Sequence, residues 1–172
     1  MKKVITLFAA LVLMSGLSTL KAQQQATATA TGSATIVTPI SISNNGDMDF
    51  GNIAVSSATA GTVALSTAAV RTPNGGVTLP AATGNVKAAS FKVTGVGSSA
   101  YSITLPKTDY IISNGSNNMT INAFTSDPSG NGVLDGSGSQ IINVGATLNV
   151  KAGQATGLYT SSTGFVVSVN YN

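Results

Sequence analysis

Residues 90–96 read Ser-Phe-Lys-Val-Thr-Gly-Val, and residues 101–105 read Tyr-Ser-Ile-Thr-Leu. In both stretches apolar side chains alternate with polar or small ones. Successive side chains of a β-strand point to opposite faces, so this alternation is typical of a strand with one buried face. Glycine and serine separate the two stretches, as they do between neighbouring strands. The pair therefore predicts a β-structure.

Similar strand-like runs recur along the rest of the chain after residue 22, and no segment repeats apolar residues at helical spacing for three turns. The other runs cover residues 48–55, 62–66, 76–79, 119–125, 140–144, 147–150 and 165–172. Many short strands of this kind predict an all-β fold, and we expect an antiparallel immunoglobulin-like β-sandwich of about eight to ten strands. The side chains expected to face inward include Ile53, Val63, Leu65, Phe91, Val93, Ile103, Leu105, Ile121, Leu148, Val150, Tyr159, Phe165, Val167 and Val169.

Four Asn-Gly pairs punctuate these runs. They are Asn45-Gly46, Asn74-Gly75, Asn114-Gly115 and Asn131-Gly132. Asparagine and glycine both tolerate the positive φ that tight hairpin turns require, so each pair predicts a turn. The glycine- and serine-rich stretch 126–139 is expected to be a long mobile loop.

The first 22 residues have the three-part pattern of a secretory signal peptide. Lys2 and Lys3 precede a nearly continuous apolar stretch over residues 4–17, and Ala22 offers a small residue before a run of glutamines. The apolar stretch is too short to span a bilayer comfortably, and no second one follows it. We therefore expect cleavage after residue 22, export, and no transmembrane segment in residues 23–172.

Export would change the charge of the protein. The net charge of +3 comes from Lys2, Lys3 and Lys21, so residues 23–172 carry five basic and five acidic side chains. A neutral chain lacks the basic surface that binds nucleic acid, and it has no general attraction to anionic lipid. These 150 residues form one expected domain, and without cysteine its stability must come from packing and backbone hydrogen bonds.

The residue types needed for most catalysis are missing from residues 23–172. This part of the chain has no His, Cys, Glu or Trp, which excludes Ser-His-Asp triads, Cys-His pairs and thiolate or imidazole zinc sites. Asp47 and Asp49 would share one face of a strand, and a glycosidase carboxylate pair is the alternative to a turn at this point. Such pairs usually come from separate strands, so we interpret the two residues as turn chemistry. The chain is expected to be no enzyme and to bind no cofactor.

One loop resembles a calcium-binding sequence. Asp127, Ser129, Asn131 and Asp135 occupy positions 1, 3, 5 and 9 of such a loop, with Gly132 at the turn position. The closing glutamate is replaced by Gly138, and no helices flank the loop. A plain solvated turn is therefore the preferred interpretation, with calcium as the alternative.

The two ends of residues 23–172 have opposite patterns. Residues 26–36 alternate small apolar side chains with Thr and Ser, and the closing residues 165–172 alternate large apolar side chains with mostly polar ones. Small side chains bury little area at about 0.8 kcal/mol per CH₂, but they suit an extended segment held in a shallow groove by main-chain hydrogen bonds. Residues 23–37 are therefore a candidate extended strand, paired within the chain or with a second subunit. The candidate assembly residues are Ala26, Ala28, Ala30, Gly32, Ala34, Ile36, Phe165, Val167, Val169 and Tyr171.

Several short motifs in a fixed order resemble a known family. They include Thr38-Pro-Ile-Ser-Ile, Asp49-Phe-Gly-Asn-Ile53, Gly75-Gly-Val-Thr-Leu79, Ala89-Ser-Phe-Lys-Val-Thr-Gly95, Tyr101-Ser-Ile-Thr-Leu-Pro106 and Val167-Ser-Val-Asn-Tyr171. In this order they resemble the secreted bacterial family known as domain of unknown function 4402. The resemblance implies an exported bacterial β-sandwich in the periplasm, on the outer surface or outside a Gram-negative cell, and it implies no activity. The end segments are also loosely similar to fimbrial major subunits, although the cysteine pair of many such subunits is absent.

Three functions follow as hypotheses. The first is a non-enzymatic, fimbria-like structural protein of the cell surface that associates with itself or with fimbrial subunits by strand donation. The second is a monomeric secreted binding module for a glycan or a partner protein. An Asp-based hydrolase is the third.

Overall fold

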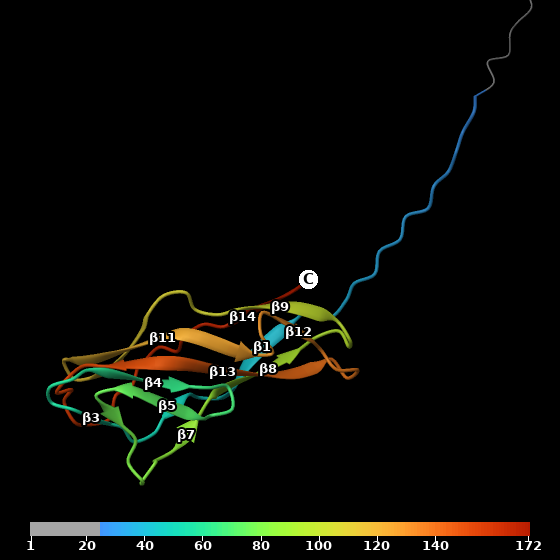
Figure 1. The fold of residues 1–172 in the computed structure, drawn as a ribbon. Helices are drawn as coiled ribbons and strands as arrows, with labels where there is room; N and C mark the ends of the chain where they lie inside the picture. Colours follow the sequence, from blue (N-terminus) through green and yellow to red (C-terminus); the bar gives the residue numbers. More distant parts are fainter. Residues whose placement is uncertain (1–24) are drawn as a thin grey trace, which may run out of the picture. The chain divides into compact units, whose positions relative to one another are not determined.

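The computed structural model describes residues 25–172, so the predicted signal peptide over residues 1–22 lies outside the described residues. Residues 25–172 contain fourteen β-strands and no helix, and every strand pair is antiparallel (Figure 1). The all-β antiparallel prediction is confirmed. The number of strands exceeds the expected eight to ten, in part because four of them are only two residues long.

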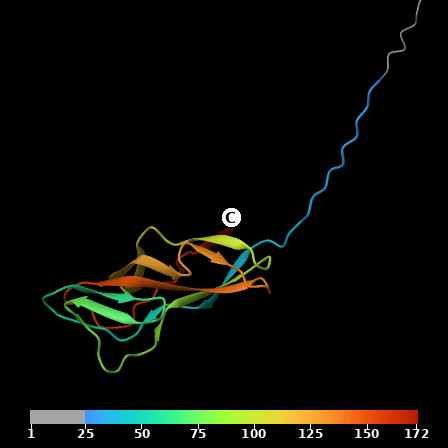
Figure 2. The ribbon, with the colours of Figure 1, turned by 45° about the vertical axis from the view of Figure 1, so that its right-hand side comes forward.

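A seven-stranded sheet forms most of the body, and its longest strand, β13 (Ser139–Val150), runs through the middle. The other strands are β1 (Ser41–Gly46), β4 (Gly61–Leu65), β5 (Arg71–Gly75), β8 (Ala89–Thr94), β10 (Tyr110–Asn114) and β11 (Asn117–Asp127). One edge of β13 pairs with β11, and the other edge is shared by β8 and β4. The sheet curls into a half-barrel, which Figures 1 and 2 show from two sides.

Gly145 lies where β13 passes from one neighbour to the other. Pairing with β8 ends at Val144, and pairing with β4 begins at Ala146. A Cβ atom at Gly145 would lie 2.3 Å from the backbone oxygen of Leu65, closer than any real side chain allows. The glycine therefore lets the end of β4 approach β13 at the fork in the sheet.

Three smaller sheets complete the fold. A three-stranded sheet has the order β12-β9-β14, and two further sheets have two strands each. The three-stranded sheet contains β9 (Ala100–Thr104), β12 (Asn131–Val133) and β14 (Ser168–Tyr171). The two-stranded sheets pair β2 (Asp49–Phe50) with β7 (Val86–Lys87), and β3 (Ala54–Val55) with β6 (Val77–Thr78).

The core consists of two apolar clusters that share one side of β13. Between Ile142 and Val150 the even-numbered side chains of β13 are buried, while Asn143, Thr147 and Asn149 are half-buried on the other side. The first cluster contains the β4 and β11 side chains, and the second contains those of β8, β9 and the chain end. Phe124 packs against both clusters. It lies in a bulge of β11, where the pairing shifts between Asn122 and Thr125.

The expected inward set is largely correct. Eight members are buried, namely Val63, Leu65, Val93, Ile103, Ile121, Leu148, Val150 and Val167, and the other six are half-buried. The expectation did not include Tyr101, Leu134 and Ile142, which are among the most deeply buried side chains. Tyr101 is buried to its hydroxyl, which donates a hydrogen bond to Oε1 of Gln140 at 2.7 Å, and burial raises the pKa of this phenol.

The predicted strand over residues 48–55 is interrupted. It divides into β2 and β3 because Gly51 has a φ of +66°, and the side chain of Asp49 accepts a hydrogen bond from the Gly51 N–H at 2.7 Å. One guanidinium nitrogen of Arg71 donates to the carbonyl oxygens of Phe50 and Asn52, both at 2.8 Å. This tight turn, closed from outside by Arg71, replaces the continuous strand that the alternation predicted.

Only one of the four predicted Asn-Gly turns forms a hairpin in the structure. Gly115, with a φ of +58°, connects β10 to β11. Asn74-Gly75 ends β5 at a turn, with a φ of +67° at Gly75, and Asn45-Gly46 ends β1 at a register shift. The prediction for Asn131-Gly132 is wrong, because that pair lies in β12. An Asn-Gly pair tolerates a turn without requiring one, and pairing with distant strands decides the outcome.

The predicted long loop over residues 126–139 is also wrong. β11 extends to Asp127, β12 crosses the stretch, and β13 begins at Ser139. Leu134 is 1% exposed and belongs to the second cluster, so it anchors the segment in the core.

Residues 25–35 form a unit separate from the body, which comprises residues 36–172. Every residue from Gln25 to Pro39 is exposed, and none belongs to a strand. The alternation in this segment is therefore not used for pairing within the described chain.

Candidate functional site

No residue of the alternating segment 26–36 belongs to a strand of the described chain. Its small face and its hydroxyl face are both exposed, and Ile36 at its end is 99% exposed. An exposed isoleucine next to a half-exposed Val37 is unfavourable in water, so this end of the segment gains most from a partner. The candidate assembly residues of this group are Ala26, Ala28, Ala30, Gly32, Ala34 and Ile36.

The other candidate assembly residues lie at the end of the chain, where the expected alternation is present. Phe165, Val169 and Tyr171 are half-buried and Val167 is buried, whereas Val166, Ser168, Asn170 and Asn172 are exposed. Val169 and Tyr171 belong to β14, which pairs with β9, and the ring of Phe165 lies against Phe91, Phe124 and Tyr110. The large face of this segment therefore packs on the second cluster of the same chain.

Tyr171 also forms hydrogen bonds that the sequence did not reveal. Its hydroxyl accepts from the N–H of Val96 at 2.7 Å and donates to the carbonyl oxygen of Thr38 at 3.0 Å. A Cβ atom at Gly95 would lie 2.2 Å from this hydroxyl, so only glycine leaves room for it. The penultimate position of an aromatic residue was the only signal in the sequence.

The calcium-loop candidates are distributed over several elements. Asp127 ends β11, Ser129 lies in the connection, Asn131 begins β12, and Asp135 follows that strand. Gly132, which would form the turn of a calcium loop, lies in β12 instead. A Cβ atom there would lie 2.4 Å from the ring of Tyr101, so packing accounts for this glycine.

The side chain of Asp135 organises its own loop. Its Oδ1 atom accepts hydrogen bonds from the hydroxyl of Ser137 at 2.7 Å and from the N–H groups of Ser137 and Ser139 at 2.9 Å. The Ser137 hydroxyl, followed by the backbone N–H of Ser139, lowers the pKa of this carboxyl. These donors hold Asp135 as a turn-forming carboxylate. Residues 25–172 contain no group of three or more His, Cys, Asp or Glu that could hold a metal ion.

Asp47 and Asp49 have local partners. The side chain of Asp47 accepts from Asn44 Nδ2 at 2.6 Å, and that of Asp49 accepts from the Gly51 N–H. Asp49 lies in β2, whereas Asp47 precedes it. Both carboxylates thus take part in turns, as the preferred interpretation expected.

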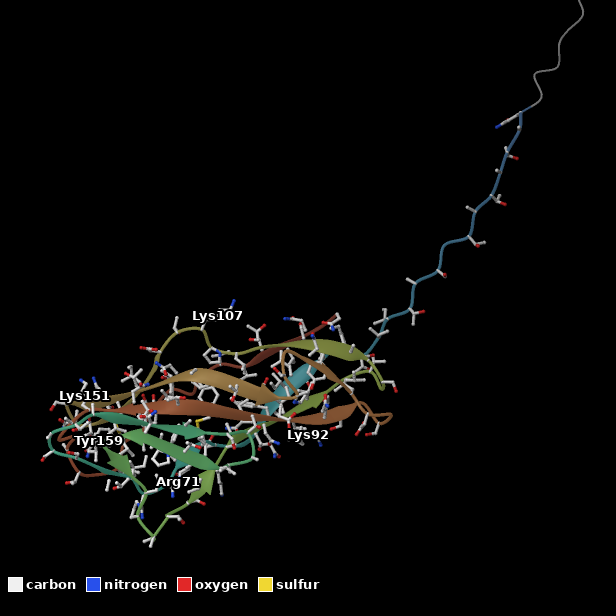
Figure 3. The ribbon with its side chains drawn as sticks, viewed as in Figure 1. Arg71, Lys92, Lys107, Lys151 and Tyr159 are labelled. Carbon is white, nitrogen blue, oxygen red and sulfur yellow. The ribbon has the colours of Figure 1, made fainter. Side chains whose placement is uncertain are left out.

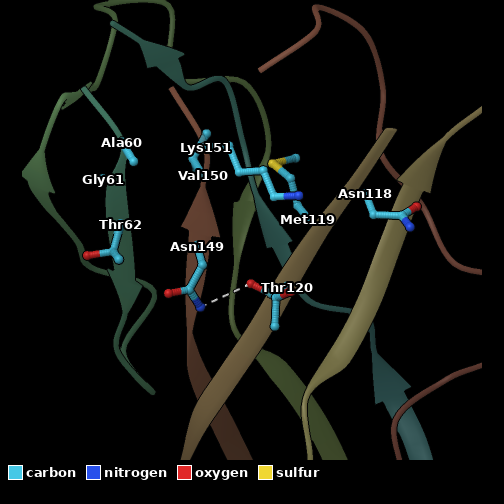
Figure 4. A pocket seen from close by; sticks show the side chains of 9 residues that line it. All are labelled: Ala60, Gly61, Thr62, Asn118, Met119, Thr120, Asn149, Val150 and Lys151. Atoms are coloured by element: carbon cyan, nitrogen blue, oxygen red, sulfur yellow. Dashed lines mark hydrogen bonds between the residues drawn. The ribbon is translucent and has the colours of Figure 1, made fainter. Parts of the chain in front are cut away.

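A hollow of about 380 Å³ lies over the ends of β4, β11 and β13 (Figure 4). Its wall combines apolar and polar side chains, and the amide of Asn149 donates to the Thr120 carbonyl oxygen at 3.2 Å and to Asn122 Oδ1 at 3.0 Å. Both N–H groups of that amide are therefore occupied, while Lys151 and Asn118 are exposed. The residues lining it are Ala60, Gly61, Thr62, Asn118, Met119, Thr120, Asn149, Val150 and Lys151.

The basic side chains do not gather. Figure 3 labels Arg71 on β5, Lys92 on β8, Lys107 after β9 and Lys151 after β13, and the four lie well apart. No helix within residues 25–172 is long and apolar enough to cross a membrane.

The comparisons with known proteins agree with the motif order. The family model described as domain of unknown function (DUF4402) matches residues 40–171, and the chain therefore belongs to that family. No curated protein and no solved structure matches it, and none of these comparisons supports the similarity to fimbrial subunits.

Proposed function

We propose that this DUF4402 protein is a non-enzymatic structural subunit of the bacterial cell surface that assembles by strand donation. One observation carries the proposal. Residues 26–36 have the alternation of a strand, yet they are fully exposed and unpaired in the described chain. A segment of this kind binds another sheet edge through its main-chain hydrogen bonds, and its small side chains fit shallow pockets.

The composition of the chain supports a structural role. Residues 23–172 provide no imidazole, thiol or glutamate, and their five aspartates include two turn-forming residues near β2 and one in the β12–β13 loop. General acid–base and nucleophilic catalysis depend on such groups in tuned environments. Backbone pairing and surface shape remain as the means by which the protein acts.

The proposed location is outside the cytoplasm of a Gram-negative bacterium. The signal-like pattern of residues 1–22 and the family resemblance support this part of the proposal. The finer architecture that we propose is immunoglobulin-like. Its support is that β8 and β13 of the large sheet and β9 of the three-stranded sheet contribute side chains to one shared cluster.

Lysine substitutions on the two faces of residues 26–36 test strand donation. If the small face enters a groove, Ala28→Lys with Ala30→Lys places charges inside it and abolishes oligomers of the full-length, exported protein. Thr29→Lys with Thr31→Lys is the matched control, because its charges would point to solvent. Light scattering after size exclusion and negative-stain electron microscopy measure the outcome. A wild-type protein that remains monomeric at all concentrations contradicts the proposal.

A monomeric binding module is the second candidate function, and the hollow over β4, β11 and β13, where Asn118 and Lys151 are exposed, favours it. Exposed amide, hydroxyl and ammonium groups on a sheet face suit a glycan. A glycan array probed with the purified protein tests this candidate, with Asn118→Ala and Lys151→Ala expected to weaken any signal. Signals that survive both substitutions would exclude the hollow as the site.

A further inference from the structure

The edges of the sheets differ in how they are protected. Natural proteins protect exposed edge strands with charges, prolines or covering segments, since an open edge pairs with other chains. β5 carries Arg71 and Pro73, and β7 carries Lys87. β10 is bridged by Thr160, whose N–H and carbonyl bond Ser113 at 3.0 and 2.8 Å. β5 and β7 are therefore protected by charge or proline, and β10 is covered at Ser113.

β1 and β14 lack all of these protections. β1 reads Ser-Ile-Ser-Asn-Asn-Gly and β14 reads Ser-Val-Asn-Tyr, with no charge and no proline. Within residues 25–172 each pairs on one side only, β1 with β8 and β14 with β9. Among the described edge strands of four residues or more, β1 and β14 are thus the two with neither a charge, a proline nor a bridging segment.

The two edges lie close together over one cluster. β1 and β14 approach each other (Figure 1), and the hydrogen bond from Tyr171 to Thr38 joins them at one end. Ile42 of β1 and Val169 of β14 pack against the second cluster, but both remain half-buried. The free edges of β1, in the half-barrel, and of β14, in the three-stranded sheet, are together called the seam. Apolar side chains of the core are incompletely covered there.

We propose that this seam accepts residues 26–36 of a second copy of the chain. The inference rests on the proposed strand donation and adds the surface that receives the strand. Paired with the free edge of β1, the segment would satisfy open backbone groups of that strand and cover Ile42 beside β14.

The dimensions and chemistry of the segment fit the seam. Eleven residues in extended form span about 36 Å, against about 20 Å for the six residues of β1, so the segment can pair along the whole edge. Neither the segment nor the strands β1 and β14 contain a charged residue, so the pairing would bury no charged side chain of these strands. Alanine and glycine on the inward face suit a cluster that already contains large side chains at this place, such as Phe91 and Leu105.

A hollow of about 350 Å³ lies at the closed end of the seam. Val37, Val96, Ala100 and Tyr171 form its apolar wall, and Ser99 and Asn172 complete the lining. It offers room for one larger side chain at an end of the inserted strand. Ile36, the only large residue in the segment, is the side chain that we expect there.

Cysteine pairing between two differently labelled copies tests the proposal, because the chain has no cysteine of its own. One full-length copy carries Ser43→Cys on β1. The other carries Thr29→Cys, Thr31→Cys or Ser33→Cys, three positions that allow for an unknown register. A disulfide forms only when the Cα atoms lie about 4.4–6.8 Å apart, so a donated strand gives a mixed dimer with one of the three. Thr72→Cys on β5, also exposed, is the matched control and should give at least ten-fold less cross-linked product.

The outcomes separate the seam from the proposed function. Mixed dimers through Ser43→Cys but not Thr72→Cys support the seam as acceptor. Oligomers that cross-link through Thr72→Cys alone overturn the seam while strand donation stands. A third test uses one chain that carries both Thr31→Cys and Ser43→Cys. If its disulfide forms within a monomer, the segment pairs inside one copy, and both the seam proposal and strand donation are overturned. Absence of oligomers and of every cross-link likewise overturns both.

Discussion

The hydroxyl of Tyr171 donates a hydrogen bond to the carbonyl oxygen of Thr38, across 133 positions of sequence and a distance of 3.0 Å. The same hydroxyl accepts from the Val96 N–H. One side chain near the end of the chain thus holds both the segment that leads into β1 and the turn after β8. It fixes the closed end of the seam through which we propose that subunits join.

Removal of this hydroxyl should destabilise the fold. Tyr171→Phe leaves the partly buried Val96 N–H without its acceptor, and we expect a loss of about 1–2 kcal/mol in the free energy of unfolding. Urea denaturation followed by circular dichroism measures it. Tyr159→Phe is the matched control, because that hydroxyl bonds only nearby partners, the Ala155 carbonyl oxygen and the side-chain amide of Gln154. A side-chain amide can turn toward other partners, whereas the backbone N–H of Val96 cannot, so a smaller loss is expected for Tyr159→Phe. Equal losses for the two variants would contradict the role given to Tyr171.

Gly95 should tolerate no side chain. In Gly95→Ala the new Cβ atom would meet the Tyr171 hydroxyl at 2.2 Å and Leu134 Cδ1 at 3.1 Å. The ring of Tyr171 must therefore move, and we expect the free energy of unfolding to fall by about 2–3 kcal/mol. Gly136→Ala is the control, since nothing lies within 4 Å of its Cβ position. Thermal unfolding of both variants measures the difference in stability. A Gly95→Ala protein as stable as the control would show that the Tyr171 hydroxyl is not held where we describe it.

Arg71 should stabilise the turn between β2 and β3. Its guanidinium donates two charge-assisted hydrogen bonds to carbonyl oxygens of that turn, so Arg71→Ala should lower the free energy of unfolding by about 2–3 kcal/mol. Lys92→Ala on the exposed face of β8 should change it by less than about 0.5 kcal/mol. Arg71→Lys is expected to recover only part of the loss, because the shorter lysine side chain does not extend its nitrogen as far as Nη1 of Arg71, which makes both hydrogen bonds. Full recovery by lysine would mean that charge alone matters at this position.

Asp135 should contribute to the pH dependence of stability. Its hydrogen bonds with Ser137 and Ser139 lower its pKa in the folded chain below the value of about 3.9 for an unfolded aspartate. A lowered pKa means that the stabilisation is complete above pH 4 and is lost as pH falls through the folded value. Asp135→Asn should therefore flatten the decline in stability below pH 4, and Asp127→Asn serves as the control. Acid titrations of the three proteins that superimpose would refute this assignment.

The sequence by itself determined the faces of many strands. Strict alternation from Phe165 to Asn172 correctly predicted which side chains turn inward, because neighbouring side chains of an extended chain must point to opposite sides. The Asn114-Gly115 pair also predicted the hairpin at Gly115, where strands that are adjacent in sequence can pair directly. The candidate segment 26–36 was likewise visible from its pattern alone.

Only the tertiary structure decided which edges stay open. The fork at Gly145, the burial of Leu134 and the place of Asn131-Gly132 within β12 all follow from contacts between segments far apart in the chain. Local alternation carries no information about such partners, since the hydrogen-bonding groups of every strand are the same. The open seam at β1 and β14 arises in the same way. An edge stays free when no other strand pairs with it, and which strands pair depends on the whole fold.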